Sequence, residues 1–420
     1  MNYRKRDAEV IWHPYTQHFQ THEFPAIIKA HGNYLHLDNG EKVLDAISSW
    51  WVNLHGHSHP HITSRMGQTL GNLQQVMFAG FTHPYAIELS ERILSLFSNR
   101  FSKVFFSDNG STSVEVALKM CFQYWSNKGI KRNKIIAFKN SYHGDTFGSM
   151  SVADRNIFSK PFWPFLFEVE LISPNSTEDL EILLKKYPES IAGMIYEPMI
   201  QGAGGMVIHN PNMLNAILDL AKDNKIMLIA DEVMTGFGRT GKLFGSDHLR
   251  VSPDIVCLSK GLTGGVLPLG LTLTTKEIYE AFLSSDKTKT LFHGHSFTGN
   301  ALSCSAALAS LDLLLADECQ KQIQWITKQH ISFASIISSL SAPIHDTRTL
   351  GTVLAVEFKT DSTSGYLNSL GQTMSSYFLK QGILLRPLGN TLYVLPPYSF
   401  GESEIDKTYS AILAFIRSHF

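Results

Sequence analysis

The sequence lacks a charge imbalance and a long apolar run. Its 36 basic and 37 acidic residues give a formal net charge of −1, which argues against an electrostatic grip on nucleic acid or on an anionic membrane. No apolar run approaches the roughly 18 residues that a membrane helix needs, because the longest, residues 306–316, is broken by Asp312. The charged first ten residues have no apolar stretch behind them and do not resemble a signal peptide. We therefore expect a cytoplasmic protein with no nucleic-acid or membrane partner.

Cysteine is also scarce, and its spacing excludes two kinds of site. The four cysteines contain no CxxC pair, which predicts neither a disulfide framework nor a thiolate metal cage and fits a reducing compartment. Histidines alternate along residues 55–61, but no cluster of carboxylates or cysteines accompanies them. We therefore predict no metal site and keep a zinc-binding module as an alternative. The histidines of this run are His55, His57, His59 and His61.

The length and the periodicity of the chain favour two domains. At 420 residues the chain exceeds what one hydrophobic core usually serves. Seven short apolar runs alternate with longer amphipathic stretches, which predicts an α/β fold with a mostly parallel seven-stranded sheet covered on both faces. The runs lie at residues 104–107, 135–138, 169–172, 192–196, 227–231, 255–258 and 270–274.

The flanking segments predict a smaller α+β domain. Apolar residues at 34–37 and 43–44 flank Asp38-Asn39-Gly40, a strong hairpin turn. Beyond about residue 317, a long helix is followed by a strand around 353–358, a helix, strands near 384 and 393, and a final helix. We assign residues 1–50 to the small domain as an N-terminal segment, 51–316 to the large domain and 317–420 to the small domain. Because no flexible linker separates them, we expect the two parts to pack closely.

Two charged residues stand at the ends of predicted strands. Asp231 closes the run at 227–231, and Lys260 follows the run at 255–258. Functional groups of an open α/β sheet gather at the carboxyl ends of its strands, so this carboxylate and this amine can share one crevice. The lysine could bind phosphate as a point charge or form a Schiff base with a carbonyl, for which burial favours the neutral amine. A structural role in a glycine-rich loop is the alternative.

A pattern at residues 104–125 predicts an anion site. The run at 104–107 leads into Asp108-Asn109-Gly110-Ser111-Thr112, and apolar residues then recur at the spacing of one helix face. A Gly-Ser turn that opens a helix directs backbone N–H groups and the positive end of the helix dipole at an anion. Gly110 and Ser111 are therefore candidates for binding phosphate, with ordinary capping by Asn109 or Ser111 as the alternative.

Aromatic residues and one arginine are candidates for a pocket wall. Tyr142 follows the run at 135–138, where its ring could stack on a flat ligand or pack in the core. Trp50 and Trp51 cannot both face one core along a strand, so at least one should line a cleft or an interface. Arg386 follows the strand near 384 and could bind a carboxylate through two hydrogen bonds, a surface salt bridge being the alternative.

The run Gly236-Phe237-Gly238-Arg239-Thr240-Gly241 matches the spacing of a dinucleotide fingerprint. It follows a strand, but the residues after it lack helical periodicity. Because the fingerprint needs its last glycine at the start of a helix, the sequence disfavours a nicotinamide-dependent oxidoreductase.

The phosphate turn, the strand-end tyrosine and aspartate, and the lysine together resemble the fold-type I, class III (ω-amino acid) aminotransferases. The resemblance extends from about Trp12 to Pro397. The segments that carry it are 229–233 (IADEV), 235–241 (TGFGRTG), 253–255 (PDI), 259–261 (SKG) and 293–300 (HGHSFTGN). Further segments are similar to the members of this family that act in biotin synthesis: 12–16 (WHPYT), 48–51 (SSWW), 142–148 (YHGDTFG) and 201–205 (QGAGG).

The resemblance implies a pyridoxal-phosphate enzyme and a role for each matching residue. Lys260 would hold the cofactor covalently and then move a proton, and Asp231 would pair with the ring nitrogen. Tyr142 would stack on the ring, and Gly110 and Ser111 would hold the phosphate. Ser296 would reach the phosphate from a second subunit, which implies a homodimer with shared active sites. The implied second layer of the site consists of Asp145, Glu197 and Arg239.

The resemblance also implies the substrates. The amino group would pass from S-adenosylmethionine to 8-amino-7-oxononanoate, giving 7,8-diaminononanoate, with Arg386 anchoring the carboxylate of the keto acid. Tyr15 would act in catalysis as well as in binding. The implied substrate-binding residues are Tyr15, Trp50, Trp51, Tyr142, Gly294, His295, Arg386 and Tyr393. The loop at 294–296 departs from the pattern of S-adenosylmethionine users at His295, so lysine as the donor, or another ω-amino acid or diamine aminotransferase, is the alternative.

Overall fold

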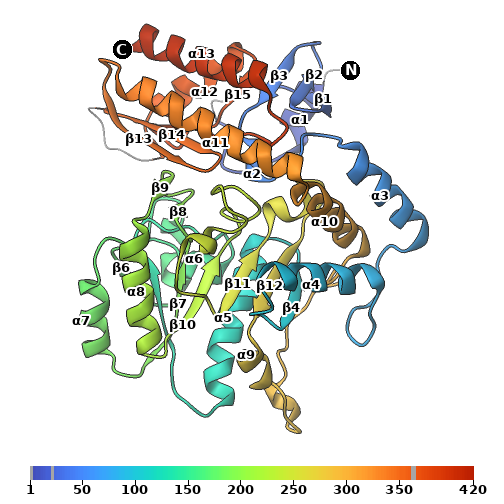
Figure 1. Ribbon diagram of the computed structural model, residues 1–420, viewed down its shortest axis with the longest axis vertical. Coiled ribbons are helices and arrows are strands. Elements are labelled where there is room, and N and C mark those ends of the chain that lie inside the picture. Colours follow the sequence, from blue (N-terminus) through green and yellow to red (C-terminus); the bar gives the residue numbers. More distant parts are fainter. Residues whose placement is uncertain (1–2, 20–22, 361–365) are drawn as a thin grey trace.

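A seven-stranded sheet forms the centre of the larger part of the molecule (Figure 1). The computed structural model describes residues 3–19, 23–360 and 366–420. All seven predicted strands are present, and the sheet is mostly parallel, since only β12 runs antiparallel to its neighbours. In spatial order the strands are β4 (Lys103–Ser107), β12 (Gly270–Thr274), β11 (Ile255–Leu258), β10 (Met227–Asp231), β7 (Ile191–Tyr196), β5 (Lys134–Phe138) and β6 (Val169–Ile172).

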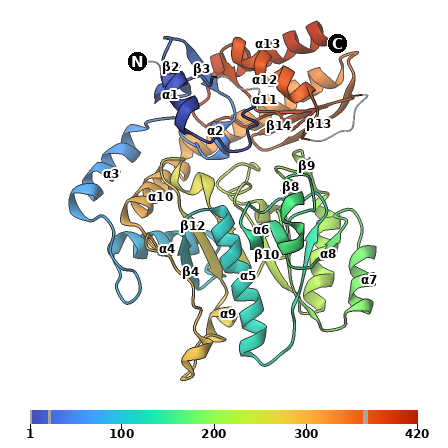
Figure 2. The same ribbon diagram turned by 180° about the vertical axis from the view of Figure 1, so that it is seen from behind.

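Helices cover both faces of this sheet, as the apolar runs predicted. Successive residues of a strand point to opposite faces, and in β10 Leu228 packs in one core with helix α8 while Ile229 packs in another with helix α5. Figures 1 and 2 show α8 and α5 on opposite sides of the strands. The helices of this part are α3 (Pro60–Asn72), α4 (Pro84–Leu96), α5 (Gly110–Asn127), α6 (Phe147–Ser151), α7 (Glu178–Lys186), α8 (Pro211–Asp223), α9 (Lys276–Glu280) and α10 (Ala301–Leu314).

The N-terminal and C-terminal segments build the smaller part together, at one end of the molecule (Figure 1). The predicted hairpin is present as two antiparallel strands, and β15 pairs in parallel with the second of them, with Ile383 opposite Leu44. This pairing supports the predicted division at residues 50 and 316, which stays a prediction. The elements are β1 (Ile27–His31), β2 (Tyr34–Leu37), β3 (Lys42–Asp45), α11 (Asp317–Ser338), β13 (Ile344–Leu350), β14 (Val353–Phe358), α12 (Leu370–Lys380), β15 (Ile383–Leu384), β16 (Thr391–Val394) and α13 (Glu402–His419).

The two tryptophans stand on an irregular turn rather than on a strand. Within α2 (Ser48–Trp51), three residues adopt positive φ angles: Ser48 at 53°, Ser49 at 60° and Trp51 at 67°. Such angles are strained for residues other than glycine and persist only where contacts hold them. Here the Asp45 carboxylate accepts hydrogen bonds from the backbone N and the hydroxyl of Ser49, at 2.7 and 2.9 Å. With this backbone conformation the Trp51 side chain is buried, whereas the Trp50 side chain is partly exposed.

The remaining elements are short. They are α1 (Tyr3–Val10), β8 (Ile200–Gln201), β9 (Val207–Ile208) and the 3₁₀ helices η1 (Lys160–Phe165), η2 (Gly245–His248), η3 (Lys260–Thr263) and η4 (Lys287–Lys289).

A continuous hydrophobic core joins the two parts. It contains Leu228 from the large sheet, Trp51 from the irregular turn, and Val356 and Tyr393 from the smaller part. The expected close packing is therefore confirmed. The four cysteines carry free thiols, of which three are buried. Among the described residues, no helix is both long and apolar enough to cross a membrane.

Candidate active site

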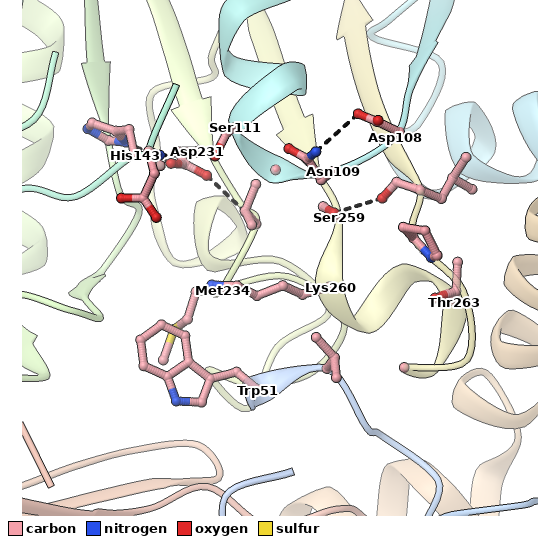
Figure 3. Close-up of a pocket in the computed structure, with 18 of the residues that line it drawn as sticks. Trp51, Asp108, Asn109, Ser111, His143, Asp231, Met234, Ser259, Lys260 and Thr263 are labelled. Carbon is pink, nitrogen blue, oxygen red and sulfur yellow. Dashed lines mark hydrogen bonds and ion pairs between the residues drawn. The ribbon is translucent and has the colours of Figure 1, made fainter. Parts of the chain in front are cut away.

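A cavity of about 590 Å³ opens where several strands of the large sheet end. It is lined by residues that directly follow β4, β5 and β11 and by the last residue of β10. The carboxyl ends of neighbouring parallel strands are where α/β sheets bind ligands. The structure thus brings together Gly110, Ser111, Tyr142, Asp231 and Lys260, which the sequence predicted as one site. Figure 3 shows three of them, Ser111, Asp231 and Lys260, around the cavity.

Lys260 crosses this cavity between Asp231 and Trp51 (Figure 3). Its Nζ lies 4.3 Å from the centre of the Trp51 ring, and it forms no ion pair within the described part of the chain. Burial lowers the pKa of the Lys260 amine to about 8, although the negative charges of Asp231 and Glu197 partly oppose this shift. A depressed pKa makes the neutral, nucleophilic amine available near neutral pH.

Asp231 is held by a buried histidine. The Nδ1 atom of His143 donates to Oδ2 of Asp231 at 2.6 Å, and the backbone N of Val233 donates to Oδ1 at 3.1 Å. Both side chains are almost fully buried. The Nε2 atom of His143 has no hydrogen-bond partner among the described residues. An oriented carboxylate at this place can bind a protonated ring nitrogen.

Glu197 lies directly behind this pair. Its carboxylate accepts hydrogen bonds from the backbone N of Tyr142 at 3.2 Å and from that of Gly202 at 2.9 Å. Burial raises the pKa of Glu197 to about 7, with the Asp231 charge acting in the same direction and His143 opposing it. Glu197 therefore fixes the loop that carries Tyr142. We call His143, Glu197 and Asp231 the buried cluster.

The first turn of α5 forms the other end of the cavity. The Asn109 side chain caps the helix by accepting a hydrogen bond from the backbone N of Thr112. This cap leaves the N–H groups of Gly110 and Ser111 for an anion, so the two interpretations of this turn are compatible. The N–H groups of Gly110 and Ser111 belong to the first turn, where no intrahelical acceptor exists. A Cβ atom on Gly110 would lie 2.6 Å from Cγ1 of Val233, and one on Gly144, where φ is +127°, would lie 2.1 Å from Oγ of Ser111. Only glycine allows this close approach.

Tyr142 and Tyr15 meet above the cavity. Their hydroxyls lie 3.3 Å apart, and the Tyr15 hydroxyl donates to Oδ2 of Asp145 at 2.6 Å. Burial raises the pKa of the Tyr15 phenol, and the hydrogen bond to Asp145 raises it further. The predicted residues Tyr15 and Asp145 are thus placed beside Tyr142.

Trp51 and Trp50 separate into two environments, as their adjacency predicted. Trp51 is buried, lines the cavity and donates from Nε1 to the hydroxyl of Tyr393 at 3.0 Å. Trp50 is 40% exposed, and the Arg386 guanidinium stacks 4.4 Å from the centre of its ring. Arg386 also donates to the hydroxyl of Tyr366 at 3.2 Å.

Two aromatic residues of this wall were missed from the sequence. Phe158 contacts Tyr15 with ring centres 5.9 Å apart and Tyr366 with ring centres 4.6 Å apart. Neither belongs to a motif, and 208 positions separate them in the numbering. The contacts close a circle of side chains that we call the outer wall: Tyr15, Trp50, Phe158, Tyr366 and Arg386.

Arg239 lies behind the site rather than in it. The guanidinium is buried and donates to the backbone oxygens of Trp51, Asn53 and Pro396, at 3.3, 3.3 and 2.9 Å. The run at 236–241 thus forms a turn that ties the tryptophan segment to the smaller part.

The loop at 294–296 does not line the cavity of its own chain. Ser296 is exposed, and its backbone oxygen accepts from Gln75. Gly294, His295 and Ser296 are therefore not brought together with Lys260 within one chain.

The histidines of residues 55–61 have separate partners. His55 contacts the hydroxyl of Ser310, His57 pairs with Asp45 and His61 with Asp312, while His59 caps α3. Within residues 3–19, 23–360 and 366–420, no group of three or more potential metal ligands is found.

Residues 15–416 match the family described as aminotransferase class III. This chain belongs to that family. A relative from Synechococcus elongatus, named adenosylmethionine-8-amino-7-oxononanoate aminotransferase, is 41% identical over 96% of this chain and 97% of its own length. A relative of the same name from Helicobacter pylori is 36% identical, over 98% and 96% of the two chains.

Solved structures agree with this assignment. The adenosylmethionine-8-amino-7-oxononanoate aminotransferase of Methanocaldococcus jannaschii matches with a TM-score of 0.93 at 36% identity, covering 99% of this chain and 98% of that one. An amine transaminase from an uncultivated Pseudomonas species, solved with bound pyridoxal phosphate, matches with a TM-score of 0.92 at 28% identity over 97% and 98% of the chains. The protein has the fold-type I architecture and is a pyridoxal-phosphate-dependent aminotransferase.

The residues of the cavity fit this cofactor. The close approach that Gly110 permits and the first-turn N–H groups of α5 suit a phosphate, and the amine of Lys260 suits an aldehyde. The Asp231 carboxylate suits a pyridinium nitrogen. When bound, the cofactor supplies a ring that accepts the electron pair left on a carbon after its proton is removed.

Proposed function

We propose that this enzyme transfers the amino group of S-adenosylmethionine to 8-amino-7-oxononanoate, giving 7,8-diaminononanoate for biotin synthesis. Near full-length relatives bearing this name support the proposal. The observation that carries it is Arg386, which stacks on Trp50 and forms no ion pair with a carboxylate among the described residues. An arginine whose neighbours are an aromatic face and a phenol can receive a substrate carboxylate in two-point fashion.

In this proposal Lys260 is the residue that transfers protons. With the cofactor bound, the neutral Lys260 amine would accept the proton from the substrate carbon that bears nitrogen and would hold it for return in the same half-reaction, and it would serve again in the second half-reaction. Asp231 keeps the ring nitrogen protonated, and His143 and the backbone N of Val233 hold that carboxylate in place.

The pocket walls serve both half-reactions. Tyr142 stacks on the ring, while Trp51 lines the cavity and is held by its hydrogen bond to the Tyr393 hydroxyl behind it. Tyr15 bridges Tyr142 and Asp145 and orients the substrate amine. Burial of Trp51 and Tyr393 excludes water from this side of the cavity and strengthens the charge pairing at Asp231.

We further propose a cytoplasmic homodimer, in which Ser296 of each chain completes the phosphate site of the other. The exposure of Ser296 and of Phe297, 63% exposed, supports this assignment. Mixing inactive Lys260→Ala and weakened Ser296→Ala proteins under exchange conditions should restore activity. No restoration would contradict the shared site.

A single-turnover experiment tests the donor. S-adenosylmethionine, lysine and a simple diamine are each mixed with the loaded enzyme, and conversion of the cofactor to its amine form is followed by absorbance. Fast conversion with S-adenosylmethionine is expected. Fast conversion with lysine only would favour lysine as the donor. His295, which departs from the pattern of S-adenosylmethionine users, is consistent with that alternative. Conversion with the diamine alone would favour another class III activity.

A further inference from the structure

A second cavity adjoins the site and is not used by the chemistry above. It measures about 890 Å³ and shares Tyr142 and Ala203 with the cavity that holds Lys260. It lies between loops of the large part, at residues 140–158 and 203–207, and segments of the smaller part, at 357 and 366–391. Tyr142 and Ala203 are therefore common to the walls of both cavities, and the second cavity lies directly next to the one that holds Lys260.

Flat aromatic side chains form one side of this second cavity. Phe158 and Tyr366 both line it, with ring centres 4.6 Å apart and an angle of 77° between the rings. Phe158 is 36% exposed, so part of its surface is open to a ligand. Aromatic residues arranged in this way offer a stacking surface for a flat heteroaromatic ring.

The polar lining is acidic and amide-rich. The described residues that line the second cavity include the carboxylates of Asp154 and Glu357 and no lysine or arginine. Glu357 pairs with Arg348 at 2.7 Å, whereas Asp154 accepts a hydrogen bond from the backbone N of Asn140 at 2.7 Å and forms no ion pair with any residue that the structure describes. Such a lining disfavours phosphates and carboxylates and favours a cationic ligand. The side-chain amides that line it belong to Asn140, Asn156, Asn368 and Asn390.

We propose that this second cavity is the nucleoside subsite for the amino donor. Phe158 and Tyr366 stack on the purine, the Asn140 side chain bonds its polar edge, and Asp154 favours the positive charge of the sulfonium. In S-adenosylmethionine, two methylenes and the sulfur separate the amine-bearing carbon from the nucleoside. The nucleoside must then lie beside the amine pocket rather than in it. This inference rests on the proposed donor.

A comparison of two amino donors isolates the contribution of the nucleoside to binding. S-adenosylmethionine and S-methylmethionine share the amino acid portion and the sulfonium, and only the first carries a nucleoside. The half-reaction efficiency of each is measured from the absorbance change of the cofactor. The native enzyme should prefer S-adenosylmethionine, and Phe158→Ala should lower this preference at least about fivefold, the loss expected for one stacking contact. Tyr366→Ala should do the same.

A matched control is available on the adjacent 3₁₀ helix. Phe165 is 73% exposed and lines neither cavity, so Phe165→Ala should keep the native preference. Thermal unfolding of each loaded variant shows whether the fold survives. A preference that stays unchanged in both Phe158→Ala and Tyr366→Ala, or an equal loss with both donors, would overturn the subsite. A native enzyme that does not use S-adenosylmethionine would instead overturn the proposed function.

Discussion

The buried cluster lines the cavity that holds Lys260, whereas the outer wall lies beside it and contacts its lining through Tyr15 and Tyr142, and the two are built in different ways. His143, Glu197 and Asp231 are each at most 5% exposed and lie at or just beyond the ends of strands in the large sheet. Tyr15 and Trp50 of the outer wall are 41% and 40% exposed and come from the N-terminal segment and a strained turn.

This difference suits the buried cluster to catalysis and the outer wall to substrate specificity. A carboxylate with fixed partners in a buried site loses little energy to reorganisation when charge develops beside it. Side chains on loops tolerate exchange and are where binding preferences reside. We therefore expect changes in the buried cluster and at Lys260 to affect every substrate, and changes in the outer wall to distinguish between substrates.

The largest effect is expected at the amine itself. Lys260→Ala removes both the covalent anchor and the proton carrier, so turnover should fall by at least about 10³-fold. Single-turnover absorbance with either substrate measures this loss, and circular dichroism should show a retained fold. Measurable turnover with one substrate but not the other would contradict the expectation that Lys260 serves every substrate equally.

Asp231→Asn should have the next largest effect. The neutral amide no longer stabilises a protonated ring nitrogen, so both half-reactions should slow by about 10²–10³-fold, with weak retention of the cofactor. Rates for the two half-reactions and the cofactor dissociation constant are the measurements. Normal turnover in this variant would show that the assigned role of Asp231 is wrong.

Arg386→Ala tests the outer wall. Loss of a charged hydrogen bond to a carboxylate should raise the KM for 8-amino-7-oxononanoate by about 10–100-fold while kcat changes less. Arg386→Lys keeps the charge but loses the two-point geometry, so it should recover only part of the affinity. An equal fall in kcat for both substrates would instead place Arg386 with the buried cluster.

The pKa of Lys260 predicts how the apo-protein takes up its cofactor. With a pKa of about 8, the neutral fraction of the amine rises from roughly one tenth at pH 7 to roughly nine tenths at pH 9. The rate of covalent loading should therefore rise about tenfold over this interval, because only the neutral amine attacks an aldehyde. Stopped-flow absorbance measures this rate, and a flat profile would contradict the burial argument.

The smallest effect is expected for Tyr15→Phe. The variant loses the hydrogen bond to Asp145 but keeps the ring that contacts Trp50 and Phe158. One neutral-to-charged hydrogen bond at a half-exposed position should change kcat/KM by about 3–10-fold. A steady-state assay with both substrates would show whether the loss is shared or confined to one.

The sequence predicted the large sheet and the buried residues well, for a physical reason. Strands covered on both faces are continuously apolar, and Asp231 and Lys260 follow such strands directly, so their meeting point comes from topology alone. Phe158 and Tyr366 could not be found in this way. Their contact depends on how a loop of the large part meets the smaller part, which no local pattern encodes.

His143 illustrates an intermediate case. It lies next to Tyr142 in the sequence, within a segment that carried the family resemblance, but nothing in its spacing pointed to Asp231. Only the fold of the loop after β5 shows that its Nδ1 lies 2.6 Å from that carboxylate. Likewise, Arg239 was assigned to the second layer of the site, but only the fold shows that it bonds three backbone oxygens, of Trp51, Asn53 and Pro396.

The parallel pairing of β3 with β15 sets an order of assembly for the site. Leu44 cannot meet Ile383 until almost the whole chain has been synthesised, which at ribosomal speed takes tens of seconds. The strands of the large sheet, which lie between residues 103 and 274, have all been synthesised before that point. Tyr15 and Trp50 flank β3 in the sequence, so the strand between them gains its C-terminal partner only after every strand that positions Asp231 and Lys260 has been synthesised.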